Sequence, residues 1–248
     1  MSSISIIVIT KNEAHNIEAC LQSVSWATEI IVLDSGSRDN TVALAKKFTN
    51  NVTVTADWPG DGAQKQRGLH MATGTWILIL DADERVTPEL KTEILQTITN
   101  TSHSGFNIPY QSYYCNQAIH FGDWSHEKHL RLFRRNQANI AANLVHFKVQ
   151  LTGTTGTMRH KILHYSFRTL EDVLHKVNYY STDGALLKQQ RKQSANFFSA
   201  LGHGAWTFFR GYIFRLGFLD GRFGLMLAIS NAEGCYYRYL KLWLLSRK

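Results

Sequence analysis

Four short apolar runs stand out in the first hundred residues, and each is followed by a polar segment. The runs are Ile4–Thr10, Ile30–Leu33, Val52–Thr55 and Trp76–Leu80. The first, second and fourth runs do not alternate with polar positions, which is typical of strands buried on both faces, and the third is a short β-branched strand. We therefore expect four strands in this part of the chain.

Helical patterns separate these runs. Asn12 is expected to cap the first helix and Thr87 the last, with Pro88 at the first helical position of the latter. Apolar residues recur at helical spacing within residues 17–24, 42–48 and 90–98, and a further helix is expected at Gln64–Ala72, after the glycine-rich loop at residues 59–62. Strand and helix thus alternate four times in about a hundred residues, which predicts an α/β fold with a mostly parallel, doubly wound sheet.

The pattern changes twice further along the chain. Residues 101–168 are rich in aromatic residues and histidines, and we expect short strands and loops there that complete the sheet. From Thr169 onward the apolar positions return to helical spacing. We therefore divide the chain into residues 1–100, 101–168 and 169–248, the last being a helical extension.

Composition narrows the class of protein. The 248 residues are 44% hydrophobic and 19% charged, which is globular, and the net charge of +8 calls for an anionic partner. Three widely spaced cysteines fit neither a disulfide framework nor a zinc site, which favours a reducing, cytoplasmic compartment. The N-terminal apolar run is too short for a secretory signal, and we expect no membrane-spanning helix.

Polar and acidic residues follow three of the predicted strands. Thr10, Asn12 and Glu13 come after the first, Asp34 after the second, and the Asp81-Ala82-Asp83 segment after the fourth. Ligands of open α/β sheets bind beyond the carboxyl ends of the strands. These side chains are therefore expected to meet at one binding edge.

The acidic residues at this edge suit two kinds of site. Asp81 and Asp83 can hold a divalent cation and a sugar hydroxyl, or they can form a solvated acidic turn that caps the next helix. Asp34 can accept hydrogen bonds from a nucleoside, or it can bond its own backbone in a turn. Lys65 and Arg67 can meet a diphosphate, or they can belong to an ordinary exposed helix face.

Several stretches resemble glycosyltransferase family 2, whose fold is the type A nucleotide-sugar-binding (GT-A) architecture. They are SIIVITKNEAHNIEACLQSV, IIVLDSGSRDNT, AQKQRG and ATGTWILILDADE, in the family's order and spacing. The later part is most similar to a subgroup that adds a hexose to the inner core of lipopolysaccharide. The features of that similarity are Trp124, LRLFRR, the Val145-His146 pair, His164-Tyr165-Ser166 and LGFLDG.

The resemblance implies an inverting transfer of a hexose, glucose by similarity, from a UDP-sugar to a lipid-linked glycan. Residues 1–100 would form the nucleotide-sugar-binding half of the domain and residues 101–168 the acceptor half. Asp34 would bind the nucleoside, Asp83 a Mg²⁺ or Mn²⁺ ion on the donor diphosphate, and Asp81 the ribose, sugar or metal. The further donor-binding residues implied are Thr10, Asn12, Glu13, Lys65 and Ala82.

The general base is expected at Glu127, because the subgroup carries Asp three residues after the tryptophan. The subgroup's Val-His-Glu reads Val145-His146-Phe147 here, so one carboxylate is missing. Asp123 and Glu84 are the reserve candidates, and His146 is expected to assist. A helical salt bridge from Glu127 to Arg131 is the structural alternative.

The last 53 residues combine aromatic and basic side chains. Residues 196–248 hold 13 of the 29 aromatic residues and seven Lys and Arg against two acids. This pattern favours peripheral attachment to an anionic membrane surface, on the inner face of the cytoplasmic membrane, and the alternative is a helical cap packed on the sheet.

Two other functions remain as alternatives to sugar transfer. A nucleic-acid-binding module would explain the charge but not the three acidic strand ends, so we expect no nucleic-acid partner. A sugar-phosphate nucleotidyltransferase would need a glycine-rich basic loop after the first strand, where this chain has Lys11-Asn12-Glu13.

Overall fold

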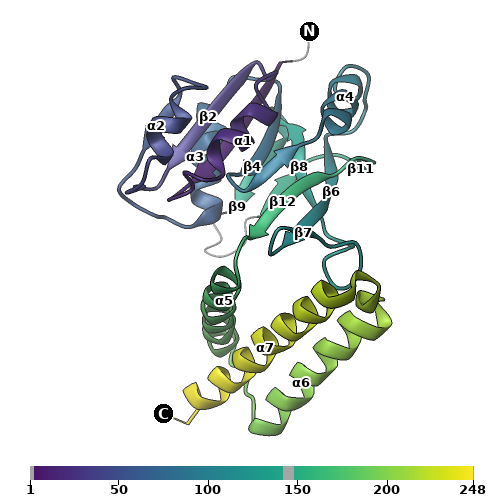
Figure 1. The fold of residues 1–248 in the computed structure, drawn as a ribbon. Coiled ribbons are helices and arrows are strands. Elements are labelled where there is room, and N and C mark those ends of the chain that lie inside the picture. The colour runs from purple at the N-terminus through teal and green to yellow at the C-terminus, as the bar shows by residue number, and fades with distance from the viewer. Residues whose placement is uncertain (1–2, 142–147, 248) are drawn as a thin grey trace. The chain divides into compact units, whose positions relative to one another are not determined.

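The computed structural model describes residues 3–141 and 148–247. The chain forms two compact units (Figure 1). The sheet unit comprises Met1–Tyr110 and Lys128–His164, and the helical unit comprises Gln111–Glu127 and Tyr165–Lys248. Residues 111–127, from the middle of the chain, thus pack with the C-terminal helices, whereas the functional halves assigned to residues 1–100 and 101–168 stay predictions.

A mixed sheet forms the centre of the sheet unit. Four parallel strands lie in the order β3, β2, β1, β4. Strand β8 then pairs antiparallel with β4, and β6 pairs antiparallel with β8. The antiparallel strand β12 pairs with β5 at the far end. This is the predicted α/β class, with the four expected strands in its parallel part. The bounds of these strands are β1 Ile4–Thr10, β2 Glu29–Asp34, β3 Val52–Val54, β4 Trp76–Asp81, β5 Glu84–Val86, β6 Gly105–Tyr114, β8 Lys128–Arg134 and β12 Ile162–Phe167.

Smaller elements complete this unit. Strand β11 (Thr155–Thr157) pairs with β6, and β9 (Ala138–Ala141) pairs with β10 (Lys148–Leu151) after the short 3-10 turn η1 (Arg135–Gln137). The ten-residue β6 is longer than the short strands expected in this region. Its apolar residues are interrupted by polar ones such as Gln111 and Ser112, both of which are buried, so the apolar pattern does not reveal its length.

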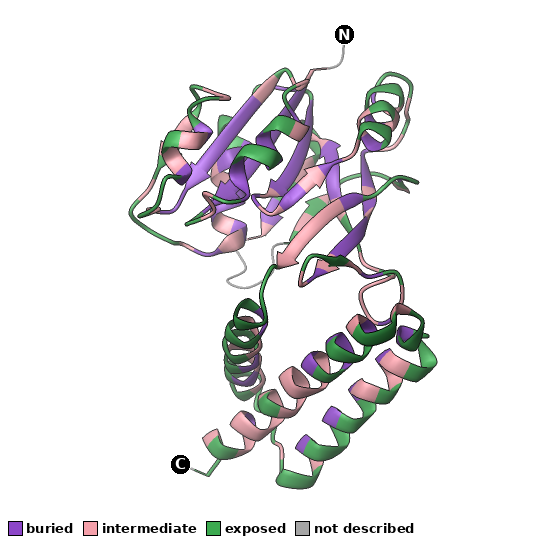
Figure 2. Ribbon diagram, in the orientation of Figure 1, coloured by how far each residue is buried: buried purple, intermediate pink, exposed green. Residues whose placement is uncertain are grey.

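Apolar residues of β1 point alternately to two cores, one on each face of the sheet. Ile6 and Val8 join the core under α1 (Ile17–Ser23), α2 (Thr41–Ala45) and α4 (Pro88–Thr97). Ile7 and Ile9 join the core under α3 (Asp61–Met71). Figure 2 shows the central strands buried, as the unbroken apolar runs predict.

One of the two predicted helix caps is correct. Thr87 caps α4 by accepting a hydrogen bond from the Leu90 amide, with Pro88 at the first position. The cap predicted at Asn12 is wrong, because α1 begins only at Ile17, after Asn16. The intervening residues form a loop instead of the first helical turn, and Asn12 adopts a left-handed conformation there, with φ 56°.

Helices α5 (Leu170–Gln190), α6 (Phe197–Phe209) and α7 (Gly221–Leu245) make up most of the helical unit, and α5 and α6 both pack on α7. A π turn, η2 (Arg210–Phe214), and a 3-10 turn, η3 (Gly217–Asp220), join α6 to α7. Helix α5 begins directly after Thr169, where the sequence predicts a return to helical spacing, and Thr169 forms a capping box there. The short strand β7 (Gln117–Ala118) pairs with the end of β6. No helix among the described residues is long and apolar enough to span a membrane.

Candidate active site

Three strand ends meet at one edge of the parallel sheet, as predicted. Thr10 of β1 is in register with Asp34 of β2, and Ile9 of β1 is in register with Asp81 of β4. The sheet register thus brings together residues that are up to 72 positions apart in the sequence. The Thr10 side chain is buried here, and its hydroxyl has no hydrogen-bond partner among the described residues.

Asp34 organises the turn that follows β2. Its fully buried carboxylate accepts hydrogen bonds from the amides of Gly36 (3.0 Å) and Ser37 (2.8 Å) and from the Ser37 hydroxyl. The turn-forming alternative for Asp34 is therefore present in the structure, because its carboxylate accepts backbone hydrogen bonds. Its assignment to a nucleoside stays a prediction.

The loop after β1 is held against the loop after β2. The Asn12 side chain accepts a hydrogen bond from the Arg38 amide at 2.8 Å, and the Asn12 amide donates to the Ser37 hydroxyl at 2.7 Å. The Glu13 amide donates to the Thr41 hydroxyl at 2.8 Å. Asn12 and Glu13 thus join the two loops that follow neighbouring strands, and their part in donor binding stays a prediction.

Asp81 lies between two buried cations. Its Oδ1 is 2.8 Å from Nζ of Lys65, and its Oδ2 is 3.1 Å from Nη2 of Arg131. Lys65 is 1% exposed and Asp81 31% exposed, so the carboxylate keeps an open side. Burial alone would raise the pKa of Asp81, but the two cations hold it well below its usual range. Asp81 is a fixed, ionised hydrogen-bond acceptor.

Lys65 does not fit the exposed-face alternative, and its contact with a donor diphosphate stays a prediction. Helix α3 directs it inward, where it bridges Asp61 and Asp81 at 2.8 Å each, so it is not on an exposed helix face. Arg67, two residues later, is 40% exposed and pairs with Asp57 at 2.6 Å. Only Arg67 fits the exposed-face alternative.

Glu84 and Tyr110 hold Arg131 beside Asp81. Glu84 is fully buried and accepts a hydrogen bond from Nη2 of Arg131 at 2.9 Å and from the Asp81 amide at 2.9 Å. Arg131 Nε donates to the Tyr110 hydroxyl at 2.6 Å. Burial raises the pKa of Glu84, although Arg131 opposes this shift. Glu84 therefore orients the strand end rather than facing solvent, where a reserve base would have to act.

Asp83 faces a histidine from β12. Ala82 is buried, and the chain turns at residues 82 and 83 between β4 and β5. This turn places Oδ2 of Asp83 3.5 Å from Nε2 of His164. Burial alone would lower the pKa of His164, but the Asp83 carboxylate and its acidic neighbours raise it to about 9.

A dense metal-ligand cluster is not formed by the described residues. Within residues 3–141 and 148–247, no group of three or more His, Cys, Asp or Glu side chains is placed to hold a metal ion. A site of two protein ligands is compatible with this finding, because Mg²⁺ commonly takes one or two carboxylates together with substrate phosphates and water.

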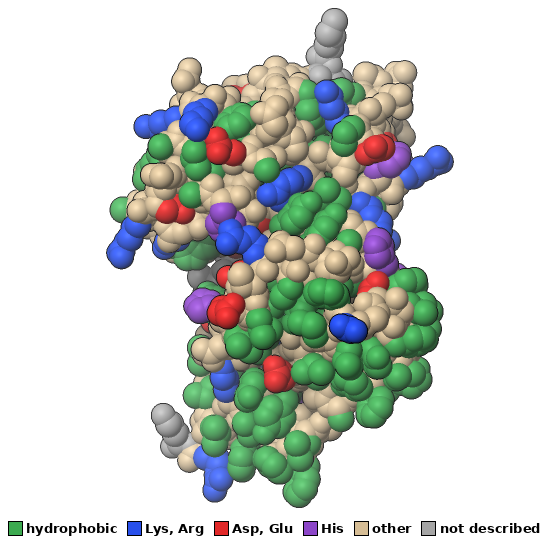
Figure 3. Space-filling view, in the orientation of Figure 1, with side chains coloured by type: hydrophobic (Ala, Val, Ile, Leu, Met, Phe, Trp, Pro, Cys, Tyr) green, Lys and Arg blue, Asp and Glu red, His purple; other side chains and the backbone are tan. Residues whose placement is uncertain are grey.

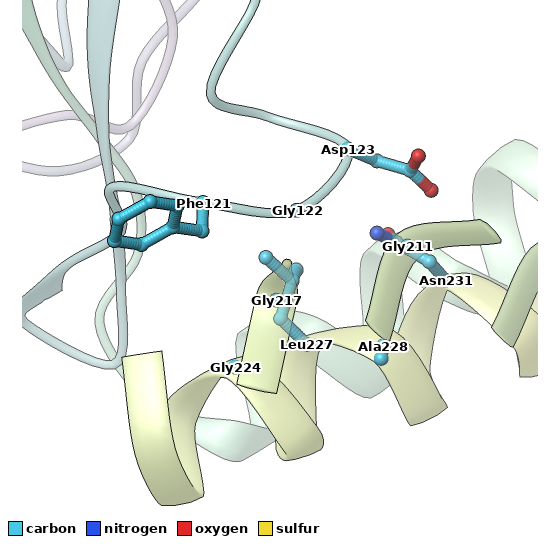
Figure 4. A pocket seen from close by; sticks show the side chains of 9 residues that line it. All are labelled: Phe121, Gly122, Asp123, Gly211, Gly217, Gly224, Leu227, Ala228 and Asn231. Carbon is cyan, nitrogen blue, oxygen red and sulfur yellow. The ribbon is translucent and has the colours of Figure 1, made fainter. Parts of the chain in front are cut away.

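The loop that carries Asp123 is fastened within the helical unit. Asp123 accepts hydrogen bonds from Arg210 (3.1 and 2.9 Å) and from Arg215 (2.9 Å). The Asp220 carboxylate accepts from the amides of His120 (3.0 Å) and Phe121 (2.8 Å). Figure 4 shows Asp123 beside Gly211, where a Cβ atom would lie only 3.2 Å from the carboxylate. Both acids therefore tie this loop to η2 and η3.

Glu127 lies at the end of the same loop, directly before β8. It is half-buried, and its amide donates to the Trp124 carbonyl at 3.3 Å. The helical pairing of Glu127 with Arg131 is wrong, because this segment is a turn followed by a strand. The predicted role of Glu127 as base stays a prediction. His146, expected to assist, lies outside the described residues, as does Phe147.

Comparisons with known proteins agree with this architecture. The model of the family described as Glycosyl transferase family 2 matches residues 5–165. This range includes the loops after β1 and β2 and the acidic residues at the end of β4. An uncharacterized glycosyltransferase of Rickettsia prowazekii is 32% identical, over 100% of this chain and 89% of the relative. The chain belongs to glycosyltransferase family 2.

Two further likenesses cover most of this family 2 enzyme. The lipopolysaccharide core biosynthesis glycosyltransferase LpsC of Rhizobium meliloti is 25% identical, over 95% of this chain and 93% of the relative. The crystal structure of S. aureus TarS residues 1–349 superposes with a TM-score of 0.50 and 16% identity, covering 73% of this chain and 65% of that one. The latter shows the GT-A fold that the resemblance implies.

Sequence reasoning missed the partners that hold the acidic residues of this glycosyltransferase. In the sequence, Arg131 is only the alternative partner of Glu127, and His164 belongs only to the stretch His164-Tyr165-Ser166 that resembles the subgroup. Arg131 is a charged residue inside the apolar strand β8, in the stretch Leu130-Arg131-Leu132-Phe133. A buried cation normally requires a buried anion, which was the available signal.

Proposed function

We propose that this family 2 glycosyltransferase moves a hexose, glucose in our assignment, from a UDP-sugar to a lipid-linked saccharide of the lipopolysaccharide core. The observation that carries the proposal is the acidic end of β4, where Asp81 is ionised and fixed and Asp83 lies beside His164. The similarity to LpsC along nearly the whole chain supports the acceptor class. Transfer with inversion follows the family resemblance.

Donor binding would use the three strand ends together. The buried, unpartnered Thr10 hydroxyl and the ordered loops after β1 and β2 offer polar contacts to the nucleoside. Asp81, held by Lys65 and Arg131, can accept hydrogen bonds from a ribose or sugar hydroxyl without changing its orientation. Both cations already contact the Asp81 carboxylate, so they fix its orientation and keep it ionised. We do not assign to them the role of a metal on the donor diphosphate.

The residues beside Asp81 fit a divalent cation. Asp83, from the turn after β4, and His164, from β12, offer an oxygen and a nitrogen ligand, provided that His164 releases its proton when the metal binds. A donor diphosphate and water would complete the coordination. Mg²⁺ or Mn²⁺, when bound, neutralises the charge that develops on the departing nucleoside diphosphate. We assign the metal to Asp83 in preference to Asp81, because each Asp81 oxygen already faces a cation.

A carboxylate must then accept the proton of the acceptor hydroxyl, and we assign this role to Glu127. Asp123 is less suited, because Arg210 and Arg215 already donate hydrogen bonds to both of its oxygens. The transition state is expected to have oxocarbenium character, as in glycoside hydrolysis. The enzyme would work at the inner face of the cytoplasmic membrane, with the helical unit in contact with anionic lipid.

A donor screen tests this function. The purified full chain is incubated with UDP-, GDP- and ADP-hexoses, with Mg²⁺, Mn²⁺ or excess chelator, and donor binding is followed by thermal shift and turnover by donor hydrolysis. A shift with UDP-glucose that needs the metal, followed by transfer to a lipid-linked core saccharide, is the expected result. Salt-sensitive binding of random oligonucleotides without any response to sugar nucleotides would instead support the nucleic-acid alternative.

A further inference from the structure

Helix α6 places its small residues inward and its large apolar residues outward. Ala200, Gly204 and Thr207 are buried, at the i, i+4, i+7 spacing of one helix face. A Cβ atom on Gly204 would lie 3.1 Å from Cβ of Tyr236 on α7, so the two helices pack closely there. A helix on a globular protein normally buries its large apolar residues, and α6 does the opposite.

The outer face of α6 is apolar and uncharged. Phe198 is 80% exposed and Trp206 55% exposed, and Leu201 and Phe209 are exposed beside them. No charged residue occurs between Gln193 and Phe209. The segment joining α6 to α7 continues the surface with exposed large apolar side chains, namely Ile213, Phe214, Leu216, Phe218 and Leu219. Figure 3 shows hydrophobic side chains gathered over the region of these helices. A contiguous apolar surface of this kind indicates an interaction site.

Exposed basic side chains occur before α6 and after the segment that joins it to α7. Arg191 and Lys192 are exposed just before α6, and Arg222 is exposed at the beginning of α7. Acidic residues are few here, because only Asp220 and Glu233 occur between residues 191 and 248. Aromatic side chains with cations at their margins suit a bilayer whose surface carries anionic headgroups. Two copies packed through this face would bring their basic margins together.

The geometry of α6 restricts how it can meet a bilayer. Its 13 residues are too few to cross a hydrocarbon core, which takes about 20 residues. The inner face, in contrast, is already occupied by α7. Only the outer face is available, so the helix must lie along the interface with its axis parallel to the membrane.

We propose that the outer face of α6, with the segment that joins it to α7, inserts into the boundary between headgroups and acyl chains of an anionic membrane. This inference rests on the membrane contact of the proposed function, and it assigns that contact to one face and one orientation. Arg191, Lys192 and Arg222 contact lipid phosphates. Phe198, Trp206 and Phe209 enter the acyl region.

Vesicle binding with matched variants tests this surface. The full chain is mixed with vesicles of pure phosphatidylcholine or of phosphatidylcholine with phosphatidylglycerol, and bound protein is measured by sedimentation. The outer-face variant carries F198S, W206S and F209S. The control carries L174S, Y179S and L186S, which remove three exposed apolar side chains from α5. The intact chain should bind the anionic vesicles, and only the outer-face variant should lose affinity, by about tenfold or more.

Quenching by acyl-brominated lipid then locates Trp206. Part of the tryptophan fluorescence of the intact chain should be quenched, and the W206F variant should lose that part while still binding. Equal loss of binding in both triple variants, or quenching that W206F leaves unchanged, overturns the proposal. The proposal is also overturned if the intact chain forms a stable dimer and does not bind vesicles, and if the outer-face substitutions make that dimer dissociate.

Donor binding is measured in the same preparations. A metal-dependent thermal shift with UDP-glucose that persists in both triple variants shows that they are folded and that the donor site is independent of the lipid surface. Loss of vesicle binding with an intact donor response therefore concerns the lipid surface alone. If the intact chain binds vesicles but no sugar nucleotide, the proposed function is contradicted and the proposed lipid-binding surface is still supported.

Discussion

The sheet unit and the helical unit bury opposite kinds of side chain. In β1 all seven residues are buried, and its large isoleucines fill two cores. In α6 the buried residues are small, and the large aromatic residues face outward. In the sheet unit, the apolar faces of the strands are covered by helices of the same unit. Helix α6 leaves large apolar side chains exposed, and an exposed apolar surface of this kind indicates an interaction site.

Both units also hold an aspartate between two cations, with different consequences. Asp81 lies between Lys65 and Arg131 and keeps an open side at the strand edge. Asp123 lies between Arg210 and Arg215, and with Asp220 it ties a loop to the helices. The same charge pattern thus presents an acceptor in one unit and fixes a segment in the other.

The largest effect is expected at Glu127, where Gln keeps the shape and removes the proton acceptor. The kcat of Glu127→Gln should fall by roughly 10²–10⁴-fold with donor affinity unchanged, because base catalysis is lost and binding is not. Asp123→Asn is the matched change in the same loop, and its kcat should fall no more than about tenfold. Acceptor-dependent transfer and donor affinity are measured in one preparation of each. Losses in the reverse order would make Asp123 the base.

A stability effect should separate the buried cation of the sheet unit from an exposed one. Lys65→Met removes one partner of a buried ion pair and should cost about 3 kcal/mol of unfolding free energy, since Asp81 keeps only Arg131. Arg67→Met removes the exposed partner of Asp57 and should leave the denaturation midpoint nearly unchanged. Urea unfolding of both variants decides this. Equal midpoints would show that the Lys65 bridge contributes little to folding.

A smaller effect should distinguish the two faces of α6. Ala200→Leu places a large side chain between α6 and α7 and should cost about 1–3 kcal/mol by overpacking. Phe198→Ser, on the outer face, should change the unfolding free energy by no more than about 0.5 kcal/mol in the absence of lipid. Thermal unfolding without detergent or vesicles measures both. A strongly destabilised Phe198→Ser variant would mean that the aromatic face is packed.

The strands of the sheet unit and their shared edge could be predicted because their causes are local. Unbroken β-branched runs mark β1 and β4, and parallel pairing then places Thr10, Asp34 and Asp81 at one edge. The partners of the acids could not be predicted in this way. Lys65 and Arg131 are 16 and 50 residues from Asp81 in the sequence. Neither spacing corresponds to a local pattern from which the ion pair could be predicted.

The helices of the helical unit could be predicted from the sequence, but the face of α6 that packs inward could not. Thr169 and the apolar periodicity after it are local signals for α5. Helix α6 is apolar on almost every side, so its hydrophobic pattern selects no face. The decisive signal is size, since Ala200, Gly204 and Thr207 recur on one side, and it becomes clear only when α7 is seen against them.

Titration of UDP into the full chain, with and without Mn²⁺, tests the central claim most directly. The account predicts that UDP binds to the intact protein in the presence of Mn²⁺, that excess chelator abolishes this binding, and that Asp83→Asn weakens it by at least about 10²-fold. The Asp123→Asn variant, altered in the helical unit, should bind UDP like the intact protein. UDP binding that is equally tight in chelator and unaffected by Asp83→Asn would contradict the assignment of the strand edge as a metal-dependent donor site.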